Sequence, residues 1–391
     1  MLKCLGGGFF LSASCLALMG AAHAMDTVIE TEKARIRVQT VADGLEHPWG
    51  IEFLPDGSAL ITERPGRLRL MSSDGSLSDP ISGIPEVDAR DQGGLLDVAL
   101  DPGFAQNRRV YLSYSEPGAG RTNSTAVARG ALNEDGSALT GVEVIFSQKP
   151  KVASTKHYGS RLVFDSQGDL FITLGERSNE KFRAQAQDLN SHLGKIVRLH
   201  PDGEVPEDNP LLQTEGALPE IWSYGHRNIQ AAAINPASGE LWAIEHGPKG
   251  GDELNIPKAG ANYGWPVVSF GVNYSGSPVG TGESDGPGFE DPIYQWTPVI
   301  APSGMAFHSG AAIPQWRGNL FVGGLAATTL VRLELNGNSV AHEERLLEAA
   351  GLRVRDVVQG PDGALYLVTD EENGEVLRVG PAEGEGVTPT E

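Results

Sequence analysis

Apolar and polar positions along this chain repeat as a short unit: an apolar run, a corner rich in Asp, Asn or Pro, a glycine, and a second, alternating apolar strand. One copy is Ile51-Glu52-Phe53-Leu54-Pro55-Asp56-Gly57 followed by Leu60-Ile61. A strand–turn–strand unit cannot bury its apolar face alone, so repeated units must stack on one another. The six copies begin at residues 51, 97, 162, 233, 305 and 357. They predict an all-β fold, a six-bladed β-propeller with long inter-blade loops over the channel mouth, where propellers hold their ligands.

The two ends of the chain predict how the ring of blades closes. Residues 34–42 alternate apolar and polar side chains with the period of a strand, and residues 375–379 do the same. Strands from the two termini often complete one blade of a propeller, which removes exposed sheet edges. We therefore expect the first and last strands to share a blade. Helical periodicity is weak, and only residues 179–193 predict a short helix.

Residues 262–298 form a long stretch rich in Gly, Pro and Ser. A disordered linker would be poor in aromatic residues. This stretch instead contains Tyr263, Trp265, Phe270, Tyr274, Tyr294 and Trp296. We expect an ordered loop that covers one face of the propeller.

The N-terminus has the pattern of a cleaved secretory signal: Lys3, an apolar core at 9–18, and Ala22-His23-Ala24. That core is shorter than the roughly 20 residues of a spanning helix. A lipid-attachment box at residues 11–15 is the weaker alternative, because Ser12 stands at its apolar position. Both cysteines, Cys4 and Cys15, lie in this segment, so the exported chain must be stabilised without disulfides. We predict a signal peptide over 1–24, a propeller over 25–380, a disordered tail over 381–391, and a periplasmic protein with no membrane anchor.

The formal net charge of −21 argues against nucleic acid or an anionic membrane as a partner. It is compatible with divalent cations and neutral substrates. Within this acidic chain, basic and polar residues gather just before the repeat units. Several Arg side chains at one channel mouth predict a small polyanionic ligand, because Arg binds carboxylates through two parallel donors. Surface ion pairing is the alternative. The residues concerned are Gln92, His157, Arg161, Arg227, Asn228, Gln230, Arg353 and Arg355.

Two of these segments suggest particular chemistry. His157 could act as a general base, since imidazole takes a proton near neutral pH, although a structural role is the common one for a lone His. We expect His226 and His246 to brace loops. Residues 247–253 form an acidic, Gly-rich loop of the kind that supplies carboxylate and carbonyl oxygens to Ca²⁺, or else an ordinary surface turn. Zinc is not expected, because the exported chain has no Cys and no close His pair.

Taken together, several motifs resemble the soluble pyrroloquinoline quinone (PQQ)-dependent sugar dehydrogenases, in particular the bacterial aldose sugar dehydrogenases. The resemblance extends from about residue 45 to residue 379. It implies a six-bladed propeller that oxidises the anomeric hydroxyl of aldose sugars to lactones. The motifs are Asp91-Gln92-Gly93-Gly94-Leu95-Leu96, His157-x-Gly159-x-Arg161-Leu162, Gly225-His226-Arg227-Asn228, Glu245-His246-Gly247-Pro248-x-Gly250-Gly251-Asp252-Glu253, Asn262-Tyr263-Gly264-Trp265-Pro266 and Arg353-x-Arg355-Asp356.

The resemblance also implies roles for individual residues and two cofactors, PQQ and Ca²⁺. His157 would be the base that takes the proton of the anomeric hydroxyl. Gly247 and Pro248 would bind the quinone-associated Ca²⁺ through their carbonyl oxygens, and Glu253 and Tyr263 would bind a second, structural Ca²⁺. An electron acceptor of unknown identity is also implied, and monomer and homodimer both stay open. The residues that would hold the quinone are Gln92, Arg227, Asn228, Tyr274, Gly324, Leu325, Ala326, Arg353, Val354 and Arg355.

Two positions depart from the glucose-oxidising branch of that family. Ala326 stands where that branch has a Lys that contacts the quinone, and Lys156 stands where it has an acidic residue before the catalytic His. A cation beside His157 would lower its basicity, so the residue that orients His157 must lie elsewhere. Two other functions stay open: a calcium-dependent lactonase or esterase on the same fold, and a non-catalytic periplasmic scaffold.

Overall fold

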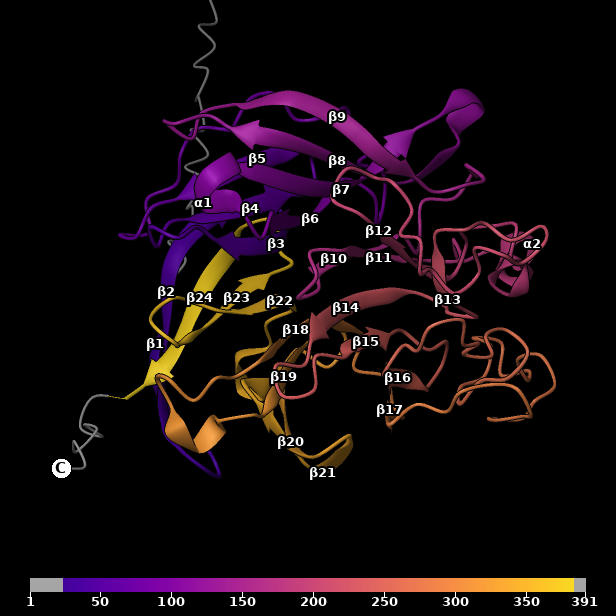
Figure 1. The fold of residues 1–391 in the computed structure, drawn as a ribbon. Helices are drawn as coiled ribbons and strands as arrows, with labels where there is room; N and C mark the ends of the chain where they lie inside the picture. The colour runs from indigo at the N-terminus through magenta and orange to yellow at the C-terminus, as the bar shows by residue number, and fades with distance from the viewer. Residues whose placement is uncertain (1–23, 383–391) are drawn as a thin grey trace, which may run out of the picture.

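The computed structural model describes residues 24–382, and the predicted signal peptide and most of the predicted tail lie outside this range. Six antiparallel sheets follow one another along the chain (Figure 1). The first strands of neighbouring sheets contact each other in a closed cycle, β3–β6–β10–β14–β18–β22 and back to β3. The predicted six-bladed propeller is therefore confirmed.

The first three blades contain three or four strands each. Blade 1 is β3 (Pro48–Phe53), β4 (Ala59–Glu63) and β5 (Arg67–Met71). Blade 2 is β6 (Leu95–Leu100), β7 (Arg109–Pro117), β8 (Asn123–Leu132) and β9 (Leu139–Ser147). Blade 3 is β10 (Gly159–Phe164), β11 (Leu170–Leu174), β12 (Lys195–Leu199) and β13 (Ile221–Tyr224).

The last three blades complete the ring. Blade 4 is β14 (Ile229–Ile234), β15 (Leu241–Glu245), β16 (Asp252–Asn255) and β17 (Tyr294–Trp296). Blade 5 is β18 (Pro302–Phe307), β19 (Leu320–Gly324), β20 (Thr329–Asn336) and β21 (Ser339–Leu346). Blade 6 is β22 (Val354–Gln359), β23 (Leu365–Thr369), β24 (Gly374–Pro381), β2 (Arg35–Leu45) and β1 (Asp26–Glu30).

Pairing of the two termini closes the ring, as the sequence predicts. β2 pairs antiparallel with β24, with Thr40 opposite Leu377, and Figure 1 shows the indigo strand beside the yellow one. β24 extends to Pro381, and the Ala382 N–H donates to Arg35 O at 3.0 Å. The first two residues of the predicted tail therefore belong to the sheet, and residues 383–391 lie outside the described part of the chain.

Buried apolar side chains form one large cluster between each pair of neighbouring blades, which is the burial that stacked repeat units need. Each first strand also has a β-bulge near its start, for example between Gly159 and Leu162 in β10 and between Val354 and Asp356 in β22. A bulge re-aims the side chains next to it. All six bulges lie at the channel end where the predicted site residues precede the strands.

Helix is scarce: α1 (Phe104–Asn107), α2 (Glu180–Arg183) and four 3₁₀ turns, η1 (Ala119–Arg121), η2 (Ala184–Gln187), η3 (Pro314–Trp316) and η4 (Glu348–Ala350). The predicted helix over 179–193 is too long. It ends at Gln187, where the Asp188 N–H donates to Gln185 O at 3.0 Å and the carbonyls of Gln185 and Ala186 also bond the Lys195 ammonium at 2.9 Å. Among residues 24–382, no helix is long and apolar enough to cross a membrane.

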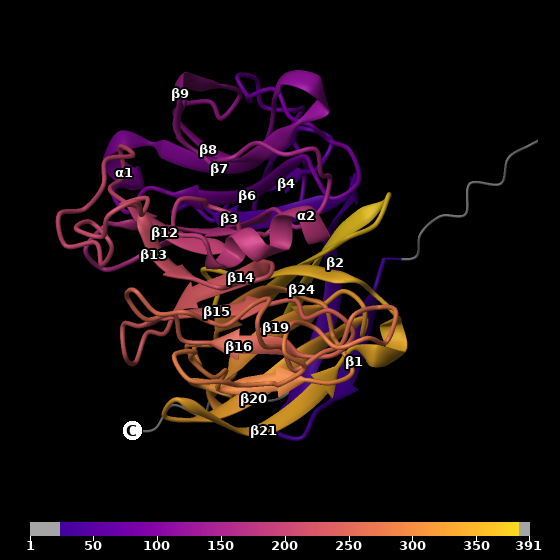
Figure 2. The ribbon, with the colours of Figure 1, turned by 90° about the vertical axis from the view of Figure 1, so that its right-hand side faces the viewer.

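The long segment 262–298 is ordered in its buried parts. It includes β17, and the side chains of Tyr263, Trp265 and Trp296 are buried. Figure 2 shows this orange segment as loops next to α2. Its position beside the inter-blade insertion of blade 3 lets it wall a cavity at the channel mouth.

Candidate active site

The channel mouth holds a polar cavity of about 400 Å³. Its lining comes from turns and strand ends of all blades except the third. The lining includes Trp49, Arg64, Gln92, Gln230, His246, Leu325, Ala326, Arg353, Arg355 and Asp370. Five of these residues are predicted quinone-binding residues: Gln92, Leu325, Ala326, Arg353 and Arg355.

Asp370 is the anion around which the cationic side chains gather. Its Oδ2 accepts hydrogen bonds from Arg355 Nη2 at 2.6 Å and from Arg353 Nη2 at 3.3 Å, and Arg64 Nη2 lies 3.8 Å from its Oδ1. Burial opposes ionisation of Asp370, but the three guanidinium groups hold its pKa below the usual range. Three Arg side chains and two carboxylates, Asp91 and Asp370, line the cavity, so the cationic side chains outnumber the anionic ones.

The two predicted Arg residues reach the cavity because they alternate along β22. Arg353 precedes the strand and Arg355 lies within it, while Val354 between them is fully buried in the core between blades 5 and 6. Arg353 Nη1 donates to Leu325 O at 3.1 Å, so the Leu325–Ala326 turn is held against it. The Val354 side chain does not line the cavity.

His157 lies just before β10 and contacts Gln92, which lines this cavity. Its backbone N–H donates to Gln92 Oε1 at 2.9 Å, and its Nδ1 lies 3.0 Å from Glu176 Oε2. Glu176 is 2% exposed, and within the described chain His157 is the histidine whose ring it contacts. A carboxylate accepts only, so Nδ1 carries the proton and Nε2 is the free acceptor. Glu176 is the orienting residue that the sequence left unidentified.

The charge state of this pair suits proton abstraction. Burial lowers the pKa of His157, Arg227 lowers it further, and Glu176 opposes both. Burial also opposes ionisation of Glu176, but His157 and Arg227 hold the pKa of that carboxyl below its usual value. At neutral pH, His157 is therefore a neutral imidazole beside an ionised carboxylate.

The backbone around His157 is tightly fixed. His157 has a φ of 52°, in the left-handed region that costs free energy for a residue with a side chain. A Cβ on Gly175 would lie 2.1 Å from His157 O, so only glycine fits there. The predicted site residue Asn228 belongs to this frame, because its Oδ1 accepts from the Gly159 N–H at 3.1 Å.

A second cavity of about 270 Å³ lies beside Glu176, the partner of His157. It is lined by Glu176, Arg183, Arg227, Trp265 and Tyr274, among others. Arg183 Nη1 donates to Asn273 Oδ1 at 3.0 Å and so joins the α2 segment to the long loop. Tyr274 is 76% exposed and lies in this second cavity rather than among the residues that line the first.

The acidic loop after β15 places two carboxylates close together. The Asn255 Nδ2 donates to Glu245 Oε1 at 3.2 Å and to Glu253 Oε2 at 3.5 Å. Burial and the nearby Glu245 raise the pKa of Glu253 well above its usual value. Asn255 Oδ1 is buried and has no hydrogen-bond partner within the described chain. A cation among these oxygens would satisfy the orphaned acceptor and ionise Glu253.

Two of the other predicted metal ligands, Gly247 and Tyr263, already have protein partners. Arg227 Nη1 donates to Gly247 O at 2.7 Å, and Pro248 lies beside Arg227 in the walls of the second cavity. The Tyr263 hydroxyl donates to Ile256 O at 2.7 Å, which leaves its backbone carbonyl as the available oxygen. Within residues 24–382, no three His, Cys, Asp or Glu side chains form a metal cluster. A calcium site here must therefore use backbone or amide oxygens as well.

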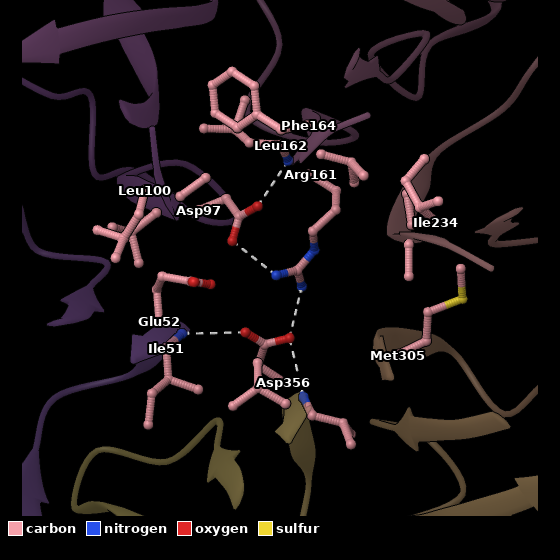
Figure 3. Close-up of a pocket in the computed structure, with 17 residues that line it drawn as sticks. Ile51, Glu52, Asp97, Leu100, Arg161, Leu162, Phe164, Ile234, Met305 and Asp356 are labelled. Carbon is pink, nitrogen blue, oxygen red and sulfur yellow. Dashed lines mark hydrogen bonds and ion pairs between the residues drawn. The ribbon is translucent and has the colours of Figure 1, made fainter. Parts of the chain in front are cut away.

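The predicted place of Arg161 at the mouth is wrong. Its guanidinium points into the channel, 2.7 Å from Asp97 Oδ1 and 3.1 Å from Asp356 Oδ1 (Figure 3). These residues line a cavity of about 320 Å³ at the opposite end of the channel. The bulge after Gly159 places Arg161 on the inner face of β10. Burial, together with Asp97 and Asp356, raises the pKa of Glu52 in this cavity to about 8.

His226 and His246 brace loops, as expected. His226 Nδ1 lies 2.9 Å from Glu245 Oε1 and its Nε2 lies 2.9 Å from Ser223 Oγ, while His246 Nε2 donates to Pro302 O at 2.5 Å. Lys156 is exposed, and its Nζ lies 3.9 Å from Asp91 Oδ2. It therefore pairs with Asp91, not with Glu176, which contacts the His157 ring.

Three residues of the site are not predicted from the sequence: Arg64, Glu176 and Asp370. One signal could have found two of them. The second strand of most blades ends at or just before an acidic residue: Glu63, Glu176, Glu245 and Asp370. Because second strands run toward the mouth, each of these acidic residues lies at the mouth end of the channel.

A family model described as glucose/sorbosone dehydrogenase matches residues 45–378. An aldose sugar dehydrogenase of Escherichia coli is 49% identical over 351 residues, which cover 89% of this chain and 94% of that protein. A quinoprotein glucose dehydrogenase of Acinetobacter calcoaceticus is 27% identical over 411 residues, which cover 85% of each.

Solved structures agree with these matches. The apo-form of the soluble aldose sugar dehydrogenase from Escherichia coli superposes with a TM-score of 0.86 at 48% identity, covering 89% of this chain and 100% of that one. The PQQ-bound form of an aldose sugar dehydrogenase from Streptomyces coelicolor gives a TM-score of 0.71 at 30% identity, covering 92% and 99%.

Proposed function

The chain belongs to the glucose/sorbosone dehydrogenase family, and on that premise we propose that it is a periplasmic quinoprotein. Its substrates would be aldose sugars, whose anomeric hydroxyl it oxidises to the lactone with PQQ and Ca²⁺ as cofactors. The observation that supports this most directly is the His157–Glu176 pair, which is joined through Gln92 to a cavity lined by three Arg side chains.

The charge of the mouth cavity fits PQQ. PQQ carries three carboxylates, and Arg64, Arg353 and Arg355 outnumber the two carboxylates of the cavity, Asp91 and Asp370. The Nε atoms of Arg64 and Arg355 are buried and have no hydrogen-bond partner within the described chain. Gln92, Arg353, Arg355 and the Leu325–Ala326 turn would hold the cofactor, with Arg227, Asn228 and Tyr274 on the side of the second cavity.

The acidic loop fits Ca²⁺, a hard cation that takes carboxylate, amide and carbonyl oxygens. Glu253, the orphaned Asn255 Oδ1 and the carbonyl of Tyr263 would hold a structural ion. The carbonyls of Gly247 and Pro248 would hold the ion that binds the quinone. Gly247 O also accepts from Arg227, and a carbonyl has two lone pairs, so both contacts can be made.

The residues of this chain supply the proton chemistry. His157 Nε2 takes the hydroxyl proton of the sugar, Glu176 holds the ring by its Nδ1–H and stabilises the resulting imidazolium, and Gln92 fixes the His157 backbone. When bound, PQQ would supply the hydride acceptor for the anomeric carbon, and Ca²⁺ would supply a Lewis acid for the quinone. The second cavity, beside Arg227 and Tyr274, leaves room for the sugar.

A calcium-dependent lactonase on the same fold is the second function, but it has no use for three Arg side chains at the mouth. The electron acceptor and the oligomeric state are not assigned. Periplasmic location follows from the signal-like residues 1–24.

The absorption spectrum of the purified chain tests the proposal. With PQQ and Ca²⁺ added, we expect a bound-quinone spectrum that an aldose bleaches, and no bleaching with His157→Ala although the quinone still binds. Arg69→Ala, far from the mouth cavity, is the control. Lactone hydrolysis without any quinone spectrum would support the lactonase instead.

A further inference from the structure

Arg64 lies in the tight turn between β4 and β5 and is the mouth residue whose donors are least engaged. Its side chain is 19% exposed and lines the mouth cavity. Nη1 donates to Asp91 O at 2.6 Å. Nη2 lies 3.8 Å from Asp370 Oδ1, beyond hydrogen-bond distance, and the buried Nε has no partner within the described chain. A buried guanidinium donor without an acceptor costs free energy, so a ligand that supplies an acceptor is favoured.

We propose that Arg64 is a ligand-binding residue that pairs with a carboxylate of the quinone. This inference rests on the proposed function and adds to it a residue that neither the motifs nor the family match singles out. Arg64 enters the cavity from blade 1, whereas Arg353 and Arg355 enter from blade 6, so the three cations would surround the ligand from two blades.

The backbone of Arg64 is fixed before any ligand binds. Its N–H donates to His47 O at 3.2 Å, and its carbonyl accepts from the Leu95 N–H at 3.1 Å. Gly94, at a φ of 138°, allows this close approach, because a Cβ there would lie 2.0 Å from Arg64 O. A cation held in this way loses little conformational entropy on binding, which favours tight capture of a carboxylate.

Two carboxylates line the cavity with the three Arg side chains. The Asp91 carboxylate accepts a hydrogen bond from Thr155 Oγ1 at 2.9 Å and lies 3.9 Å from Lys156 Nζ. Asp370 already accepts hydrogen bonds from Arg353 and Arg355, so it offsets the two Arg side chains of blade 6 in part. The facing wall, Leu325 and Ala326, contributes no side-chain charge. Arg64, at 3.8 Å from Asp370, is the least neutralised guanidinium of the three. It is therefore the cation with most of its charge available to a carboxylate.

The test measures quinone affinity, not turnover. The full chain in Ca²⁺ buffer is titrated with PQQ and, separately, with PQQ whose carboxylates are methyl esters, and the quenching of protein fluorescence gives each Kd. We expect Arg64→Ala to weaken binding of the acid by roughly 10- to 100-fold, as for a lost charge-assisted hydrogen bond, and to leave ester binding unchanged. Arg64→Lys should recover part of the loss.

Arg69 gives a matched control, since it belongs to the same hairpin and its side chain is 18% exposed, but it bonds Ser78 O and Glu63 instead of facing the cavity. Equal affinity of Arg64→Ala and wild type for the acid would overturn the inference and leave the proposed function intact. Equal losses for acid and ester would also overturn it, by showing that Arg64 only supports the fold. If the wild type does not bind the quinone, both this inference and the proposed function are wrong.

Discussion

Glu176 determines which nitrogen of His157 can accept a proton. The 3.0 Å contact occupies Nδ1, and the left-handed backbone at His157 is held by Gln92 and by the closely packed Gly175. The proposed base is thus held by three neighbours from two parts of the chain, Gln92 and the consecutive residues Gly175 and Glu176. A single motif around His157 could predict the base but not the residues that orient it.

Replacing Glu176 with Gln tests this dependence. Gln keeps an oxygen for Nδ1–H but loses the charge that stabilises an imidazolium. We expect turnover to fall, by less than the about 10²–10⁴-fold expected for His157→Ala. Quinone affinity should not change. Glu215→Gln, an exposed carboxylate between β12 and β13 of the same blade, should behave as wild type.

The same variant has a defined pH signature. Because burial and Arg227 hold the pKa of His157 below 6.5, wild-type turnover should rise with pH below that value and be constant above it. Glu176 raises the pKa of His157, so Glu176→Gln should move this rise to still lower pH. A pH–rate profile for both proteins measures the shift. A rise at higher pH in the variant would contradict the assignment.

At the scale of elements, the repeat unit predicts strands well and insertions poorly. All six first and second strands appear where the apolar pattern places them, because their faces are buried between blades. The helix predicted over 179–193 ends early, and the local pattern of apolar residues could not predict this because a residue on a later strand is involved. Lys195 lies on β12, and its ammonium takes the carbonyls of Gln185, Ala186 and Leu193 at 2.8–2.9 Å.

This buried ammonium anchors the insertion that walls the second cavity. Lys195→Met should lower the free energy of unfolding by about 2–3 kcal/mol, since three buried carbonyls lose a charged donor. Denaturant unfolding measures the loss. Lys258→Met, an exposed lysine paired with Glu290, should change stability by less than about 0.5 kcal/mol. Similar stability of both variants would show that Lys195 does not anchor the segment.

At the scale of the whole molecule, the sequence predicts the six-bladed fold, the pairing of the two termini and the location of the site at the channel mouth. It does not predict which residues face the opposite end of the channel. The sequence predicts Arg161 at the channel mouth because Arg161 shares a motif with His157. The bulge in β10 turns it inward to Asp97 and Asp356. Register irregularities of this kind arise from contacts between blades, which a single chain segment does not encode.

Calcium should matter to the whole molecule through the loop of blade 4. Glu253→Gln removes a carboxylate from the proposed structural site while it leaves Gly247 and Pro248 in place. An ion that binds only the folded state stabilises it by mass action. We expect a lower melting temperature in Ca²⁺ and a smaller difference between Ca²⁺ and chelator for this variant.

Activity of Glu253→Gln at saturating PQQ and Ca²⁺ should survive at low temperature, because the proposed quinone-bound ion has other ligands. Glu283→Gln, an exposed carboxylate in the long loop, is the matched control. If Glu253→Gln and wild type gain equally from Ca²⁺, Glu253 is not a ligand.

The pairing of β2 with β24 has a consequence for biosynthesis. Thr40 and Leu377 are partners about 340 residues apart in the chain. At about 5–20 residues per second, a ribosome needs about 20–70 s to make the second after the first. Throughout that interval one edge of β2 has no partner, and blade 6 cannot form. The molecule therefore cannot complete its fold before its last strand has been synthesised, so premature termination near the C-terminus should leave an open, aggregation-prone ring rather than a smaller stable one.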